Sequence, residues 1–208
     1  MNRRIRELLK RGEDDTLDYK QQITDAGKIA KTMSAFANHK GGTLLVGVKD
    51  NRKISGIRSE DEKYMLDLAA RFYCKPEVEL TMYEHDIGDK RIIECFVNPG
   101  DDKPYYAKGE DGKWWAYVRV KDQTLLASKI VLDVLRRQSS GYPTVIEYSS
   151  KEQALLEYLR ENDRITMQKF RKLVNISTRR ASKILVNLIS AGVIRSHTTE
   201  KTEYYTLV

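Results

Sequence analysis

The chain has 208 residues, of which 40% are hydrophobic and 32% are charged, and its formal net charge is +7. This length is compatible with one large or two small domains. No apolar run approaches the roughly 18 residues of a membrane-spanning helix, and the basic N-terminus lacks the apolar stretch of a secretory signal. We therefore expect a cytoplasmic protein with no membrane partner. Cys74 and Cys95 show no CxxC spacing, so we expect reduced thiols and neither a disulfide framework nor a zinc site.

The positive charge is concentrated near the C-terminus. Residues 150–208 hold 11 Lys and Arg against 6 Asp and Glu, whereas residues 1–149 hold 26 against 24. An excess of this kind favours a polyanionic partner such as nucleic acid. A solvated basic surface without a partner explains the same numbers, so charge alone leaves both interpretations open.

Strands and helices mix over the first 137 residues, which indicates an α/β domain. Ile29, Met33 and Phe36 recur at helical spacing, and residues 43–48 form a short apolar run typical of a strand buried on both faces. Asp50 follows that strand, where α/β proteins often place working residues. The expected elements, in chain order, are strand 17–21, helix 28–38, strand 43–48, helix 60–73, hairpin 77–85 with 90–97, strand 114–120 and helix 128–137.

A polar segment with Gly and Pro, residues 138–143, is the best candidate for a linker. We therefore expect an N-terminal domain over 1–138, a linker over 139–149 and a C-terminal domain over 150–208. The C-terminal domain reads as a helix over 151–162, a helix capped by Thr166, a helix capped by Ser177, and a hairpin of 193–197 with 203–207. Three helices followed by a hairpin predict a winged helix-turn-helix.

The third helix of this domain has one apolar and one polar face. Its apolar stripe consists of Ala181, Ile184, Leu185 and Leu188. The opposite face presents Thr178, Arg179, Ser182, Lys183 and Val186. Hydroxyl and basic groups suit a DNA major groove, and Arg179 could contact a guanine bidentately. The alternative is that the winged helix docks a protein or forms a homodimer.

Several motifs of the N-terminal region resemble those of the Schlafen AlbA domain, a module associated with nucleic-acid binding. Residues 13–20, EDDTLDYK, are similar to the E-S-x-x-L-E-F-K opening of that family, and residues 34–50 match its A-F-A-N-x-x-G-G-x-L-x-x-G-V-x-D core. Residues 103–106 and 117–120 match its late K-P-x-Y and Y-V-R-V elements. The resemblance covers about residues 8–137. It implies an α/β fold with a mixed sheet and flanking helices, often fused to a winged helix.

The same resemblance implies a candidate catalytic and metal site at Glu13, Asp18 and Asp50, the positions that match the metal-assisted RNA-cleaving carboxylates of nucleolytic Schlafen proteins. Mg²⁺ or Mn²⁺ would be the metal, because three convergent carboxylates repel one another unless a hard cation joins them. Asp18 replaces the usual Glu, which shortens its reach to a metal. The competing interpretation is that Asp18 forms a local salt bridge with Lys20, which shares its face of the strand, while Asp50 ends a turn.

Two further groups of residues bear on ligands. Residues 42–49 have the glycine spacing of a phosphate loop, but Val48 interrupts the Gly-Lys pair and the segment lies on a strand, so we do not expect ATP binding. Trp115, Tyr117 and Arg119 share one face of a strand. The aromatic rings could stack on bases but fit core packing better. We regard Arg119 and Lys20 as candidate phosphate contacts.

The sequence therefore predicts a DNA-binding transcriptional regulator in which Thr178, Arg179, Ser182 and Lys183 contact DNA. The first alternative is a metal-dependent endonuclease that cuts RNA or DNA through the three carboxylates. The second alternative is a protein-docking module, in which the winged helix binds protein within a homodimer.

Overall fold

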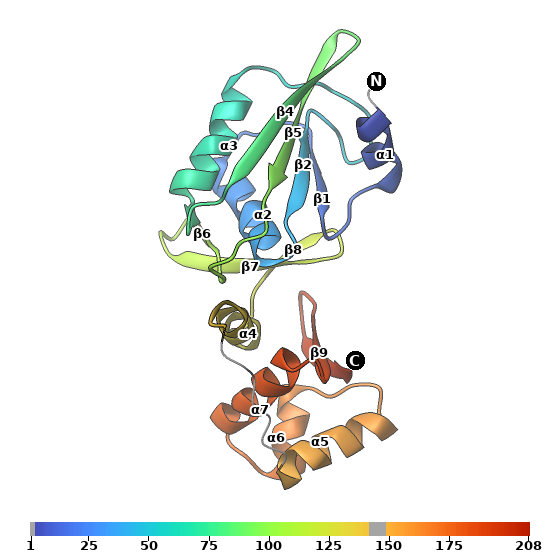
Figure 1. Cartoon of the computed structure of the whole chain (residues 1–208), viewed down its shortest axis with the longest axis vertical. Coiled ribbons are helices and arrows are strands. Elements are labelled where there is room, and N and C mark those ends of the chain that lie inside the picture. The colour runs from blue at the N-terminus through green and yellow to red at the C-terminus, as the bar shows by residue number, and fades with distance from the viewer. Residues whose placement is uncertain (1–2, 142–148) are drawn as a thin grey trace. The chain divides into compact units, whose positions relative to one another are not determined.

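The computed structural model describes residues 3–141 and 149–208. The chain divides into two compact units, Met1–Leu126 and Ala127–Val208, and each is described by itself (Figure 1). The first unit mixes strands and helices and the second is mainly helical, so the expected fold class, an α/β domain followed by a small C-terminal domain, is confirmed.

The central sheet of the first unit is mixed, with strand order β1-β2-β5-β4. Its strands are β1 (Leu17–Lys20), β2 (Gly42–Val46), β4 (Leu80–Ile87) and β5 (Lys90–Val97). β1 and β2 run parallel, and the remaining pairs are antiparallel. Every residue of β2 is buried, as its continuous apolar run predicts for a central strand. β4 and β5 form the expected hairpin, with Gly88 at φ +64° in its turn.

A second, antiparallel sheet has the order β3-β6-β7-β8. Its strands are β3 (Cys74–Lys75), β6 (Tyr106–Lys108), β7 (Trp114–Val120) and β8 (Gln123–Leu126). The helix α2 (Ala26–Asn38) begins at Asp25, whose carboxylate accepts a hydrogen bond from the Lys28 N–H. Ten of the thirteen residues of α2 are buried because the helix lies between the two sheets, and α3 (Asp61–Phe72) packs beside it.

The opposite face of the central sheet is covered by α1 (Arg3–Arg11), so α1 and α3 lie on opposite sides of the sheet in Figure 1. Ile5 of α1 is fully buried among Leu17 and Tyr19 of β1. Sequence reasoning did not anticipate this helix. Its signal was the spacing of Ile5, Leu8 and Leu9, which places three apolar side chains on one helical face.

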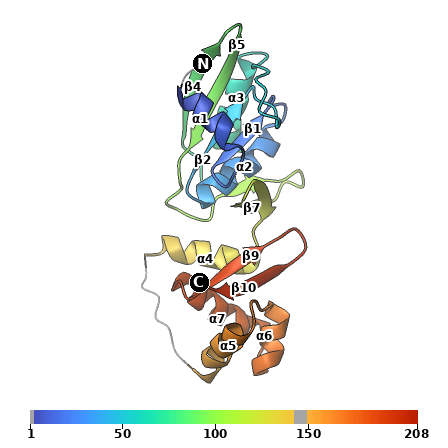
Figure 2. The ribbon, with the colours of Figure 1, turned by 90° about the vertical axis from the view of Figure 1, so that its right-hand side faces the viewer.

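The second unit contains four helices and an antiparallel hairpin among its described residues (Figure 2). These elements are α4 (Lys129–Ser139), α5 (Ser150–Glu161), α6 (Met167–Val174), α7 (Thr178–Ser190), β9 (Ile194–Thr198) and β10 (Glu203–Leu207). Thr166 and Ser177 accept capping hydrogen bonds from backbone N–H groups, as predicted. Asn175 ends α6 in the left-handed conformation, at φ +48°, which turns the chain tightly into α7.

The helix α4 departs from the expected domain boundary. We expected it to close an N-terminal domain that ends at residue 138, but it packs against α7, and Ile130 and Val134 share the core of the second unit. The helix has its own N-cap at Ser128 and an apolar face, and local sequence gives no indication of which unit that face will contact. Part of the expected linker, residues 142–148, lies outside the described residues, and Ser139 belongs to α4.

Candidate nucleic-acid interface

The outer face of α7 carries cations that are open to solvent at its N-terminal end. Thr178, Arg179 and Lys183 are exposed, Ser182 is half-buried, and Arg180, which sequence reasoning did not select, is exposed as well. Within residues 3–141 and 149–208, the side chains of Arg179, Arg180 and Lys183 form no ion pair and no hydrogen bond. These three cations therefore keep their full capacity to bind an anionic partner.

A groove of about 1000 Å³ runs between α4 and α7 and brings the four predicted α7 residues together. The charged residues that line it are Lys129, Asp133, Arg137, Glu152, Arg179, Arg180 and Lys183. Five of these are cations and two are carboxylates, so the groove is positively charged. Lys129 and Arg137 come from α4, which sequence reasoning had assigned to the other domain.

α4 also covers the C-terminal half of the outer face of α7. Val186, which helical spacing places opposite the apolar stripe, was expected to face outward, but it is only 8% exposed and shares a core cluster with Ile130 and Val134 of α4. The guanidinium of Arg137 donates a hydrogen bond to the side-chain oxygen of Asn187 on the same half. The expectation for Val186 was therefore wrong, and the outer face of α7 is open only over its first two turns.

The three carboxylates predicted as a metal site, Glu13, Asp18 and Asp50, lie in one region of the first unit but do not form a set of metal ligands. One Glu13 oxygen accepts a hydrogen bond from the Tyr19 N–H at 2.8 Å. Burial raises the pKa of the Glu13 carboxyl, and Asp18 and Asp50 raise it further, whereas the Tyr19 N–H and the Lys20 ammonium lower it. Asp50 is exposed, at the tip of a turn after β2.

Asp18 is occupied by two cations. Its Oδ1 lies 3.3 Å from the Arg119 guanidinium, and its Oδ2 contacts the Lys20 ammonium. The predicted salt bridge between Asp18 and Lys20 is thus present. Lys20 also donates to the carbonyl oxygen of Tyr19 at 2.9 Å, so its ammonium is held within the domain.

Arg119 is not a surface cation. Its side chain is 1% exposed, and it donates hydrogen bonds to Thr124 Oγ1 at 3.0 Å and to the carbonyl oxygen of Asp14 at 2.8 Å. Its guanidinium also lies 5.0 Å from the ring centroid of Phe36. The expectation that Arg119 contacts a phosphate is therefore corrected, because the guanidinium joins β7 to β1 inside the unit.

These contacts do not fit a metal centre. In the part of the chain that the structure describes, no three His, Cys, Asp or Glu side chains form a group that could hold a metal ion. The Asp18 carboxylate would have to leave Arg119 and Lys20 before it could coordinate Mg²⁺ or Mn²⁺. We derive no reaction step through a metal at Glu13, Asp18 and Asp50.

Asn38, the asparagine of the A-F-A-N motif, joins α2 to the second sheet. Its amide nitrogen donates to the carbonyl oxygens of Tyr105 at 2.8 Å and Tyr117 at 2.9 Å, and its Oδ1 accepts from the Tyr105 N–H at 2.7 Å. Trp114 and Trp115 on the same sheet are 38% and 40% exposed, so the core packing expected for Trp115 is only partial. Both residues belong to β7.

Comparison with known proteins defines the first unit. Residues 13–128 match the family described as Schlafen, AlbA_2, which spans more than half of the chain. The chain belongs to the Schlafen AlbA_2 family. Residues 128–203 match the PCI domain, and this match begins where the second structural unit begins. Membership of the AlbA_2 family links the chain to a nucleic-acid-related role, as the sequence motifs implied.

The solved structures that resemble the chain distantly include the following two. The DIP2311 protein from Corynebacterium diphtheriae is 17% identical, with a TM-score of 0.47 over 70% of this chain, which spans only 33% of that protein. The N-terminal domain of a RecG-related protein from Nitrosomonas europaea, described as an ATP-dependent DNA helicase relative, is 23% identical, with a TM-score of 0.43 over 60% of this chain and 95% of that domain. No curated protein matches the chain. None of the helices in the described part combines the length and the apolar character that crossing a bilayer requires.

Proposed function

We propose that this AlbA_2 protein is a DNA-binding transcriptional regulator whose second unit is a winged helix that contacts duplex DNA through the first two turns of α7. The observation that carries this proposal is the set of exposed, unpaired cations at the start of α7, namely Arg179, Arg180 and Lys183. They lie beside the hydroxyl of Thr178 in a groove of positive charge.

The physical chemistry of the helix end supports contact with DNA. In helix-turn-helix proteins, the N-terminal residues of the second helix contact base edges. The unsatisfied N–H groups at a helix start add partial positive charge, which attracts phosphate. Coverage of Val186 and Asn187 by α4 leaves these first turns open, and Lys129 and Arg137 extend the basic surface along α4.

A protein-docking role is the second candidate, because the lining of the same groove includes the apolar residues Ile184 and Val186, although these are only 5% and 8% exposed. The two functions differ in their salt dependence. Binding to duplex DNA loses about 0.9 log unit of affinity per log unit of salt for each phosphate that is neutralised. A protein docked on apolar surface shows a much flatter response.

The test measures fluorescence anisotropy of labelled duplex DNA with the full chain over a salt series. The Arg179→Gln/Lys183→Gln variant should bind more weakly, with a salt slope smaller by about 1.8 if each cation neutralises one phosphate. The matched control, Arg71→Gln/Lys75→Gln, removes the same charge from exposed positions of the first unit. The regulator proposal fails if both variants bind DNA alike. Labelled duplex RNA and single strands, run in parallel, determine which nucleic acid is preferred.

A further inference from the structure

The segment that follows β2 is a loop closed by backbone hydrogen bonds and a β-bridge. Gly47 has φ +88°, and its N–H donates to the carbonyl oxygen of Lys20 at 2.8 Å. A Cβ at Gly47 would lie only 2.9 Å from the backbone of Gly56, so the two strands of the loop are in close contact. Val48 and Ile54 pair as an antiparallel bridge, which closes the loop into a short hairpin.

This hairpin places two lysines directly opposite each other. The Lys49 N–H donates to the carbonyl oxygen of Lys53 at 3.0 Å, and residues opposed in an antiparallel pair project from the same face. Like charges in such a position destabilise the pair. Both ammonium groups are exposed, and no carboxylate within the described residues forms an ion pair with either. A costly arrangement of this kind points to a function that repays it.

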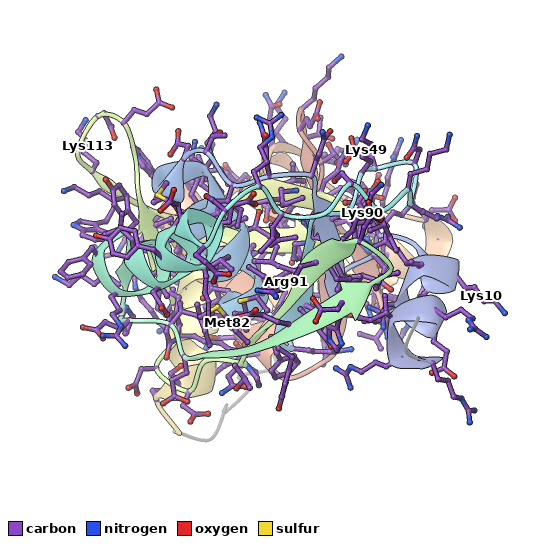
Figure 3. All side chains as sticks on the ribbon, turned by 90° about the horizontal axis from the view of Figure 1, so that it is seen from above. Lys10, Lys49, Met82, Lys90, Arg91 and Lys113 are labelled. Atoms are coloured by element: carbon purple, nitrogen blue, oxygen red, sulfur yellow. The ribbon has the colours of Figure 1, made fainter. Side chains whose placement is uncertain are left out.

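Two further cations join them. The Ile57 N–H donates to the carbonyl oxygen of Arg91 at 2.7 Å, which fastens the loop to the start of β5 and brings Arg58 beside Lys90. The Lys90 ammonium donates to the carbonyl oxygen of Ile54 at 3.0 Å. Viewed from above, Lys49 and Lys90 lie on the same side of the unit, and Lys113 lies on the far side (Figure 3).

The four cations line one pocket of about 460 Å³, which we name the loop pocket. Its described lining residues are Gln21, Lys49, Lys53, Ile54, Ser55, Gly56, Ile57, Arg58 and Lys90. Not one of these is a carboxylate. The volume falls in the range of small-ligand sites, about 300–1000 Å³.

The neighbouring cation Arg91, unlike the four cations of the loop pocket, is neutralised by carboxylates of the same unit. Arg91 lies 3.1 Å from a Glu60 oxygen, 3.3 Å from Glu84 and 3.0 Å from Asp86. Carboxylates are thus available close to the loop pocket, and Glu60, Asp86 and Asp89 line an adjoining pocket with Arg58 and Lys90. Within the described residues, however, none of the four cations of the loop pocket forms an ion pair, so the pocket keeps a net positive charge.

We propose that the loop pocket binds a phosphate group, carried either by a nucleic-acid strand or by a free nucleotide. Lys49, Lys53, Arg58 and Lys90 supply the charge. The Ser55 hydroxyl, whose oxygen is buried and has no hydrogen-bond partner among the described residues, supplies a neutral donor. The site lies in the first unit and does not depend on the proposed contact of α7 with DNA.

The test uses the full chain in an Arg179→Gln/Lys183→Gln background, so that failure of the α7 proposal and failure of the loop-pocket proposal remain distinguishable. The variant Lys49→Gln/Lys53→Gln is compared with Arg71→Gln/Lys75→Gln, which removes equal charge from the last turn of α3 and from β3, outside the lining of the loop pocket. The probes are labelled single-stranded DNA and RNA oligonucleotides, AMP and inorganic phosphate. The midpoint temperature of thermal unfolding should be unchanged or slightly raised in Lys49→Gln/Lys53→Gln, because a repulsive pair is removed.

We expect Lys49→Gln/Lys53→Gln to weaken oligonucleotide binding at least about tenfold. The salt slope should fall by up to about 0.7, the value for one phosphate contact with a single strand. Loss of oligonucleotide binding alone assigns the phosphate to a nucleic-acid strand, and parallel loss of AMP or phosphate binding assigns it to a small anion. The proposal is overturned if the background chain binds none of the probes, or if the two variants bind all of them equally.

Discussion

Replacing Arg119 by methionine should destabilise the first unit strongly. The guanidinium pairs with Asp18 and donates to Thr124 and to the backbone of Asp14, and the side chain is 1% exposed. Methionine keeps a comparable apolar stem but donates no hydrogen bond. The variant therefore leaves the Asp18 carboxylate, whose side chain is 6% exposed, with one cation fewer.

The expected loss follows from the burial of this pair. Breaking a buried ion pair by removing one partner costs about 3–5 kcal/mol. Lys20 still contacts the second oxygen of Asp18 from a side chain that is 36% exposed, so we expect a loss near the lower end, about 3 kcal/mol. At a urea m value of about 2 kcal/mol/M, the unfolding midpoint of the first unit falls by about 1.5 M.

The chain provides its own reporter for this measurement. Both of its tryptophans, Trp114 and Trp115, lie on β7, so their fluorescence follows the unfolding of the first unit in urea. Adding Asp18→Asn to Arg119→Met should recover part of the loss, because the double variant no longer buries an unpaired charge. A loss below about 1 kcal/mol, the range of exposed ion pairs, would refute the assignment of Arg119 to the interior and restore it as a surface cation.

The remaining predictions concern thiols, pH and backbone strain. Burial raises the pKa of Cys74 and Cys95 to about 12, so only about one thiol in thirty thousand is ionised at pH 7.5, and iodoacetamide should label the folded chain very slowly but label both in urea. Burial raises the pKa of the Glu203 carboxyl in the folded chain. The neutral carboxyl therefore stabilises the fold at pH values below the ordinary pKa of 4.5, and this stabilisation is lost as the pH rises through the raised pKa of the folded state. Glu203→Gln should therefore stabilise the second unit at pH 7 and not at pH 4, as followed by circular dichroism at 222 nm; equal effects at the two pH values would contradict this. Gly47→Ala should cost about 2 kcal/mol more than Gly88→Ala in urea unfolding, because both have positive φ but only Gly47 has backbone within 3 Å of the added Cβ.

The elements with strong periodicity could be predicted from sequence. The apolar spacing in α2, the continuous apolar run of β2 and the glycine turn between β4 and β5 each determine a local structure without help from the rest of the chain. The short strands β3 and β6 carry no such signal, because two or three residues are too few to show a period. The placement of α4 depends on a long-range contact with α7, which local sequence does not encode.

The residues of the candidate site could likewise be predicted only where local sequence determines their position. The exposed cations of α7 follow from helical spacing alone, so Arg179 and Lys183 could be selected from sequence. The roles of Arg119 and Val186 could not, since each depends on a partner far away in the chain. Arg119 shares a strand face with the exposed Trp115 and the half-buried Tyr117, and only the approach of β1 shows that Asp18 neutralises it.

The attachment of α4 to α7 determines where the chain can be divided. A fragment that begins at residue 150 would present Val186 to water and would leave Asn187 without the guanidinium that contacts it. We expect such a fragment to aggregate through this exposed apolar surface. A fragment of the second unit, for expression alone or for fusion to another protein, should therefore begin at Ala127, directly after β8, the last strand of the first unit.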